Sequence, residues 1–428
     1  MTDDRHVSRR RLLEYGALSA STFALAGCLG NGDDDPDGEP DEESDDDTDD
    51  TDDILAFPEI EDPPDAVYLP THRERMRMVE PVEAGDYLIG PMLTYPHPFW
   101  LTDGSEVERV DPTAEDDVHL MVTAWDRETG HVVPLDSSPV FELYQEGEFI
   151  AENRPWLMIS QQMGFHFGDN VALEGDGTYR VEGRINPVNV RKTGAFEGRF
   201  EAAVEFAFEF EYDDELRALA TDIEYFPEDR WGERGALEPM GHGDGDDHHE
   251  DGGDGHSDHH DGHEDDHHDG DDHHADDHDE HGDGHHDDDD HHDEHHAIPY
   301  SALPPVDDLP GTHQDTLESG DAEFAITLLE PGTRLTDDGW YLAVSPRTPY
   351  NRCVLPLMAL EATVDGEEYA LTETMDHELG HHYGVSLESD PDGADLGLEV
   401  VTPPQVSRHR GYETAFLDMP PMSTVISR

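Results

Sequence analysis

The chain has 428 residues, and 106 acidic side chains against 24 basic ones give it a formal net charge of −82. Two segments without Lys or Arg, 32–53 and 242–296, hold 15 and 25 of the acids, which leaves 66 for the rest. Such a surface repels phosphate groups, which excludes nucleic-acid binding and electrostatic docking on anionic lipid. At very high salt the Debye length is about 3 Å and this self-repulsion is screened, so we expect a halophilic source.

The first 28 residues have the features of an export signal. An arginine pair within residues 8–13 resembles a twin-arginine motif and precedes a short apolar run, 15–26. That run is too short for a membrane-spanning helix, which needs about 20 residues. The next tetrapeptide, Leu-Ala-Gly-Cys ending at Cys28, resembles a lipobox. We therefore expect 1–28 to be a signal, with lipidated Cys28 anchoring the chain outside the cell membrane.

Composition divides the rest of the chain into five parts. Residues 29–60 are acidic with almost no apolar side chains, which predicts a disordered tether. Residues 61–213 and 297–428 contain short runs rich in Val, Ile, Phe and Tyr between turn residues, which predicts β-sandwich domains. Between them we expect a connector at 214–241 and, at 242–296, a disordered His/Asp-rich linker. The predicted fold class is all-β, with two β-sandwich domains.

One predicted strand is especially clear. Within 200–212 aromatic side chains alternate with glutamates, so that Phe206, Phe208, Phe210 and Tyr212 share one face. The alternation predicts a half-buried strand with a solvated acidic face.

The two sandwiches share a sequence pattern. Residues 163–174 and 379–388 both contain Gly-x-His-aromatic-Gly followed by an apolar strand. Downstream, 185–194 and 402–411 share the order Pro, Arg, Gly. We therefore expect the second sandwich to be a diverged tandem repeat of the first.

Histidine and methionine side chains gather in the first sandwich. His119 and Met121 are two residues apart on a predicted strand, so they leave the same face. Met158, Met163 and His166 lie close together just before another strand. Imidazole and thioether groups on adjoining elements bind transition metals, so these five residues are predicted to form a metal site.

The order of these motifs is typical of a known family. The sequence Gly-Phe-His-Phe-Gly-Asp-Asn at 164–170 follows an earlier Asp-x-His-Leu at 117–120 and precedes a Phe-rich last strand. Over 80–213 the chain thus resembles the periplasmic iron-transport lipoprotein family. The resemblance implies an immunoglobulin-like sandwich that binds metal and works beside a membrane iron permease.

The resemblance also assigns ligands and suggests the cargo. His166 matches the family's ligand histidine, His119 its first-strand histidine, and Met158 or Met163 its methionine. Met121 stands where the family has a carboxylate, and the family's last histidine has no counterpart in this stretch. Exchanging a carboxylate and an imidazole for a thioether shifts the preference from iron toward Cu(I). Iron and copper are therefore both expected.

A second group of candidate ligands occurs in the second sandwich: Met375, His377, His381, His382 and His409. The spacing of His377 and His381 is reminiscent of helical zinc sites. The glycine at 380 disfavours a helix there, so we do not expect a metallopeptidase. The group is either a duplicated metal site or a set of surface residues on a structural domain.

Residues 242–296 contain 19 of the chain's 30 histidines, many as adjacent pairs. Without fixed geometry they bind zinc, nickel or copper weakly, through whichever groups converge. The segment is predicted to scavenge metal for the ordered sites; the alternative is a salt-tolerant linker.

The predicted function is capture of iron or copper outside the membrane and delivery to a membrane iron permease or other metal transporter. No catalytic motif is present, so we expect no enzyme activity. The alternatives are a cell-surface adhesion or assembly module with a His-rich spacer, and metal buffering by that spacer alone. The sequence leaves a homodimer open.

Overall fold

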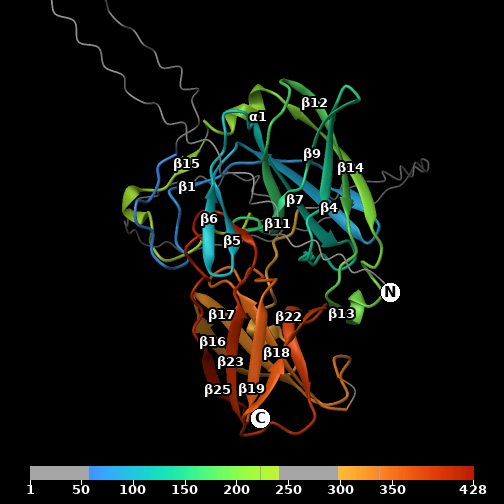
Figure 1. Cartoon of the computed structure of the whole chain (residues 1–428), viewed down its shortest axis with the longest axis vertical. Helices are drawn as coiled ribbons and strands as arrows, with labels where there is room; N and C mark the ends of the chain where they lie inside the picture. The colour runs from blue at the N-terminus through green and yellow to red at the C-terminus, as the bar shows by residue number, and fades with distance from the viewer. Residues whose placement is uncertain (1–56, 222, 241–296, 337) are drawn as a thin grey trace, which may run out of the picture. The chain divides into compact units, whose positions relative to one another are not determined.

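The computed structural model describes residues 57–221, 223–240, 297–336 and 338–428 (Figure 1). They belong to one compact unit, residues 51–428. The signal with Cys28, most of the acidic tether and the His-rich segment 242–296 lie outside the described residues. The described part contains no helix that is both long and apolar enough to cross a membrane.

The regular elements of the first half are almost all strands. They are β1 (His72–Arg73), β2 (Arg77–Met78), β3 (Val82–Ala84), β4 (Tyr87–Thr94), β5 (Phe99–Asp103), β6 (Glu106–Val110), β7 (Val118–Asp126), β8 (Val140–Gln145), β9 (Glu148–Asn153), β10 (Trp156–Ser160), β11 (Gly164–Val171), β12 (Gly177–Ile185), β13 (Arg191–Thr193), β14 (Val204–Tyr212) and β15 (Glu224–Tyr225). A short helix, α1 (Asp214–Ala218), follows β14 and begins where the Asp213 side chain accepts a hydrogen bond from the Leu216 backbone N–H.

The second half contains the remaining strands. They are β16 (Thr312–Ser319), β17 (Ala322–Leu329), β18 (Trp340–Arg347), β19 (Ala359–Val364), β20 (Glu367–Ala370), β21 (Thr372–Asp376), β22 (Gly380–Leu387), β23 (Asp395–Thr402), β24 (Ser407–Arg408) and β25 (Met422–Val425).

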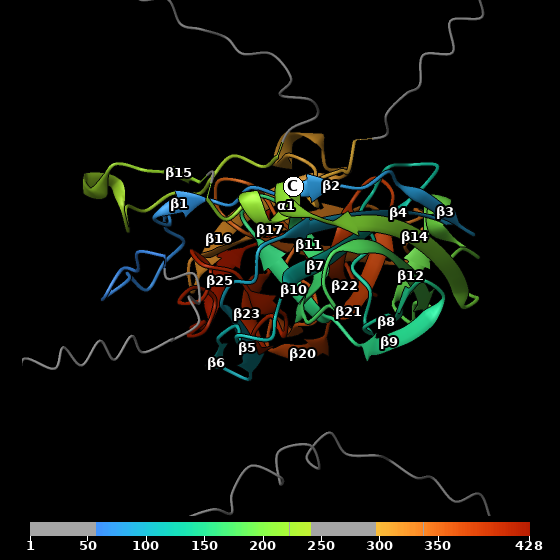
Figure 2. The ribbon, with the colours of Figure 1, turned by 90° about the horizontal axis from the view of Figure 1, so that it is seen from above.

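Each half contains two sheets that pack together, and the first half also contains the two-stranded sheet β1-β15, so the predicted all-β sandwich fold is confirmed. In the first half a nine-stranded sheet, β2-β4-β7-β11-β10-β24-β5-β6 with β3 on β4, packs against the four-stranded sheet β14-β12-β8-β9. In the second half β13-β21-β22-β18-β17-β16 packs against β20-β19-β23-β25. Seen from above, β8, β9, β12 and β14 lie together beside the larger sheet (Figure 2).

The strand predicted within 200–212 is β14, and its alternation is confirmed. Phe206, Phe208, Phe210 and Tyr212 are buried, whereas the intervening glutamates are exposed. Strand β7 differs because all nine of its residues are buried. A strand buried on both faces must be covered by other segments on the side away from the core, and this covered side holds the site described below.

The two halves exchange short strands. β24, from the second half, pairs with β10 in parallel and with β5 antiparallel. β13, from the first half, pairs in parallel with β21, and Figure 1 shows its green segment beside the orange strands. Each large sheet is therefore completed by residues from the other half.

Candidate metal centre

One face of the nine-stranded sheet carries a row of donor side chains. The register places Met158 of β10 opposite His166 of β11, and Asn170 of β11 opposite His119 of β7. Antiparallel partners lie on the same face, and successive residues alternate between faces. The residues between these positions belong to the hydrophobic core. The donors therefore lie on the face directed away from the core.

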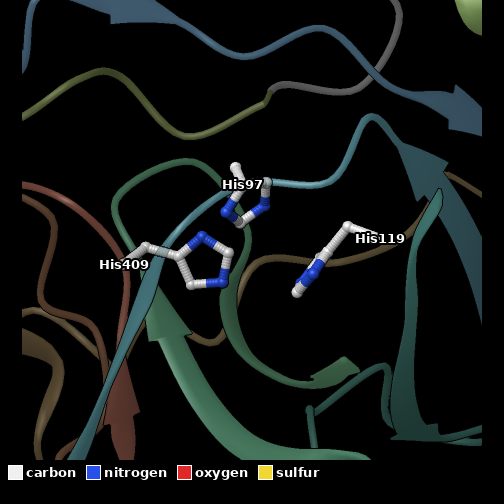
Figure 3. A group of neighbouring side chains, drawn as sticks. All are labelled: His97, His119 and His409. Carbon is white, nitrogen blue, oxygen red and sulfur yellow. The ribbon is translucent and has the colours of Figure 1, made fainter. Parts of the chain in front are cut away.

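Four buried imidazoles meet on this face. His119 and His166 come from the sheet, His97 from the loop between β4 and β5, and His409 follows β24. One nitrogen each of His97, His119 and His409 lies within 4.8 Å of the others, and Figure 3 shows the three rings around a common space. Nε2 of His166 is 3.0 Å from Nε2 of His409. The group could hold a metal ion.

Hydrogen bonds determine which ring nitrogen is available. Nδ1 of His97 and Nδ1 of His166 lie 3.1 and 3.0 Å from backbone carbonyl oxygens. Nδ1 of His119 lies 2.8 Å from Oδ1 of Asn170, whose amide nitrogen donates to the His97 carbonyl. Carbonyl oxygens only accept, so each Nδ1 carries the proton and each Nε2 keeps its lone pair. Among the described residues, Nε2 of His97 and of His119 has no hydrogen-bond partner.

Burial keeps these rings neutral and leaves the site negative. It lowers the pKa of His97 to about 4 and holds the pKa of His119 and of His166 well below the usual value. Oε2 of Glu74, between β1 and β2, is 3.8 Å from Nε2 of His97 and 3.8 Å from Nδ1 of His409. Burial opposes ionisation of Glu74, but positive charge at His97 and His409 outweighs it and holds its pKa well below the ordinary value, so a bound cation can take the place of protons on these rings. One carboxylate among neutral rings favours a cation.

Gly168 leaves space among the donors. A Cβ atom there would lie 2.7 Å from Nε2 of His119, 3.1 Å from Sδ of Met158 and 3.3 Å from Cγ of Met121. Because glycine has no side chain, the imidazole nitrogen and the thioether sulfur can both approach the strand closely at this position. Imidazole and thioether suit copper, and imidazole with carboxylate suits iron.

A small cavity of about 30 Å³ borders the site, enough for roughly one or two water molecules. Glu74 and His409 line it together with His72, Met76 and Arg410, among others. The carboxylate and one imidazole of the site thus border a space that an ion or a water molecule can occupy.

The structure brings together four of the five residues predicted for the first site: His119, His166, Met158 and Met121, whose Cγ approaches the same point at Gly168. Met121 and Met163 also pack with other methionines. We name this group the methionine cluster, which consists of Met76, Met92, Met121, Met163 and Met240.

Sequence reasoning missed His97 and Glu74. The sequence did contain a signal for His97, which stands between Pro96 and Pro98 directly before a strand. Two prolines restrict the loop and so fix the position of the residue between them. Glu74 had none, since it is one of 106 acidic residues.

The second predicted site is not formed as expected. His409 contacts the imidazoles of the first site instead of those in its own half. Of the other four, Met375 of β21 is opposite His381 of β22, and Nε2 of His381 lies 2.7 Å from Glu373. His377 accepts from the Ala195 backbone N–H, and His382 lies 3.2 Å from the Tyr341 hydroxyl. The physical reason is strand exchange, which places β24 and the following His409 in the other sheet.

Residues 377–381, His-Glu-Leu-Gly-His, match the His-Glu-x-x-His pattern of helical zinc sites. In the structure they form a turn followed by the start of β22, and Gly380 has a φ of 69°. The pattern needs one helical face to align its two histidines, and this segment lacks it.

The strand pairing of the first site recurs in the second half with a shift of 216 residues. Thr374 is opposite His382 as Met158 is opposite His166. Strand register gives the other equivalents: Tyr341 is opposite Ser386 as His119 is opposite Asn170, so Tyr341 replaces His119, and Thr193 of β13 replaces His409. The Tyr341 hydroxyl is 3.2 Å from His382, and a guanidinium, that of Arg191, lies over the Tyr341 ring. Of the four imidazoles of the first site, the second half thus has a counterpart for one, His382, and the cationic side chain of Arg191 lies near it.

Comparisons with known proteins give partial matches. A family model described as a domain of unknown function, DUF7350, matches residues 307–425. No curated protein matches the chain. Two solved structures of FetP from uropathogenic Escherichia coli strain F11 are similar over 32% of this chain. A copper-bound variant has 22% identity over 97% of its own chain and a TM-score of 0.26; the protein as isolated has 21% identity over 96%, and the same TM-score.

Proposed function

We propose that this chain is an extracytoplasmic metal-binding protein that captures iron or copper and delivers it to a membrane transporter. The observation that supports this most directly is the convergence of four buried imidazoles from four separate segments. Three of them have Nδ1 bound to an oxygen acceptor, which directs the Nε2 lone pair to bind a cation. Glu74 and Met158 add a carboxylate and a thioether to the set.

The position of the site agrees with capture and release of the ion rather than with its permanent retention. It lies on the face of the sheet away from the core and borders a cavity lined by Glu74 and His409. A cargo site needs a route for the ion, and this cavity provides the space next to two of the ligands. We propose no enzymatic role for the chain.

Three further parts belong to the proposal, and two of them concern sequence outside the described residues. Lipidated Cys28 would anchor the chain to the cell membrane, and a membrane iron permease or other metal transporter would receive the ion. The 19 histidines of 242–296 would collect zinc, nickel or copper weakly and raise its concentration near the ordered site.

The test is a competition titration of the full mature chain in high salt with Fe(II), Cu(I), Cu(II) and Zn(II). We expect a tight site for iron or copper at the imidazoles, with its affinity reduced at least 100-fold by His119→Ala or His166→Ala. His313→Ala, an exposed histidine of the second half, is the matched control and should leave the site intact. If both site variants bind iron and copper as the wild type does, the proposal is wrong and binding belongs elsewhere in the chain.

A further inference from the structure

The methionine cluster lies beside the imidazole site, and its member Met121 borders both. Its three fully packed members, Met92, Met121 and Met163, are at most 6% exposed. Met76 and Met240 are partly buried and pack against them. The members come from five separate segments, so no local sequence repeat accounts for their meeting.

The cluster differs in composition from the other cores of the chain. All three of its buried members are methionines, and five of the chain's 12 methionines belong to it. The two other small core clusters consist of Leu, Ile, Ala and Tyr and contain no methionine. Aliphatic side chains would fill an ordinary core position equally well, so packing alone does not account for five thioethers in one place.

Strand register connects the cluster with solvent on one side and with the imidazole site on the other. Met78 of β2 is opposite Met92 of β4, and Met92 is opposite Met121 of β7. Met121 is opposite Gly168, the position at which Nε2 of His119 and Sδ of Met158 converge. Met78 is 49% exposed, whereas Met92 and Met121 are buried. Neighbouring partners on one face are in contact range, so a row of thioethers leads from the surface to the site.

One further contact gives the cluster access to an ion. Met76 lines the cavity that Glu74 and His409 also line. The cluster thus borders the cavity next to the imidazole site.

We propose that the methionine cluster is a second metal site, specific for a soft monovalent cation, namely Cu(I). Thioethers are neutral, soft donors that select Cu(I) over iron or zinc. The donors that the cluster offers are all thioethers. Exposed Met78 is the entry point. This site does not depend on the function proposed for the imidazoles, because its donors are different atoms.

The test uses the full chain labelled with ¹³C at the methionine methyl groups and titrated with Ag(I), a redox-inert substitute for Cu(I), in concentrated chloride-free potassium nitrate. We expect the methyl signals of the cluster to shift, in the wild type and in His119→Ala alike. Met92→Leu/Met163→Leu, which conserves volume, should weaken Ag(I) binding at this site at least tenfold. Met358→Leu/Met419→Leu, two buried methionines outside the cluster, is the matched control and should leave it unchanged.

The proposal is overturned if the cluster's methyl signals stay fixed while Ag(I) binds elsewhere, or if Met92→Leu/Met163→Leu titrates as the wild type does. Because the readout is on methionine, the His-rich segment does not obscure it. Failure of the imidazole site would leave the metal affinity of His119→Ala unchanged, so the two proposals can fail separately.

Discussion

Nε2 of His166 lies 3.0 Å from Nε2 of His409, although the two residues are 243 positions apart. The proton on Nδ1 of His166, directed at the Gly164 carbonyl, leaves its Nε2 as an acceptor. If His409 donates through Nε2 to His166, its Nδ1 keeps a lone pair that faces the Glu74 carboxylate 3.8 Å away, so two acceptors face each other. A bound cation would relieve the repulsion between these two acceptors. The site is therefore completed by the second half of the chain.

Asn170 should act as a positioning residue for the site. Its Oδ1 accepts from Nδ1 of His119, and its amide nitrogen donates to the His97 carbonyl, so it fixes two ligands. We expect Asn170→Ala to weaken metal binding about 10- to 100-fold while metal stoichiometry stays the same. Competition titration measures this, with Asn189→Ala, on an exposed pair with Asp136, as the control. Equal affinity in both variants would contradict the role.

Gly168→Ala should crowd the donors that approach this position. The added Cβ would meet Nε2 of His119 at 2.7 Å and Sδ of Met158 at 3.1 Å. We expect at least a tenfold loss of metal affinity and a decrease in unfolding free energy of about 1–3 kcal/mol from overpacking. Gly397→Ala is the control, because its Cβ would have only ordinary contacts. Unchanged affinity in Gly168→Ala would show that metal binding does not need the close approach of donors at this position.

Metal binding at the imidazole site should resist mild acid. A pKa lowered to about 4 for His97, and to well below the usual value for His119 and His166, keeps these rings neutral as pH falls. Protons therefore compete for the site near pH 4, whereas ordinary imidazoles, with a pKa of about 6.5, are protonated earlier. The amount of bound metal, measured between pH 7.5 and 4, should fall in two steps. Metal should leave the His-rich segment first and the imidazole site second. One single loss near pH 6.5 would be inconsistent with buried ligands.

Asp376 should contribute to stability where the halves meet. The buried carboxylate accepts from Thr193 Oγ1 at 2.7 Å and from Arg334 at 2.6 and 2.8 Å. We expect Asp376→Asn to lower the unfolding free energy by about 2–4 kcal/mol at pH 7. Asp390→Asn, in an exposed pair with Arg428, should change it little. Urea unfolding in high salt measures both.

The same variant has a defined pH dependence. Burial opposes ionisation of Asp376, but the Arg334 and Thr193 hydrogen bonds hold its pKa far below the ordinary value. A depressed carboxylate pKa adds stability above the unfolded-state pKa of about 3.9, and this stability is lost as pH falls below it. The difference between wild type and Asp376→Asn should therefore shrink from pH 7 to pH 3. A constant difference would show that the carboxylate acts only through packing.

Sequence pattern predicted the sandwich because alternation is a local property. The alternation of Phe206, Phe208 and Phe210 with glutamates needs only one strand and a core to be recognised. Strand exchange is different, because it depends on how distant segments pair. Nothing within 402–411 indicates that Ser407 and Arg408 join the sheet of the other half.

The candidate site, like the fold, was predicted only where local sequence carries the signal. His119 and His166 stand at fixed places in strands, so spacing and resemblance both found them. His409 was found as a candidate but assigned to its own half, since sequence proximity was the only guide. Glu74 was missed because one acid among many carries no pattern, and only the fold brings its carboxylate near His97 and His409.

The most direct test of the imidazole site is anomalous diffraction from crystals of the chain grown with copper or iron. The account predicts one strong peak at bonding distance, about 2.0–2.3 Å, from Nε2 of His119. At least two of His97, His166 and His409 should complete its coordination. A metal peak elsewhere, with these imidazoles bound only to water or to each other, would contradict the central claim.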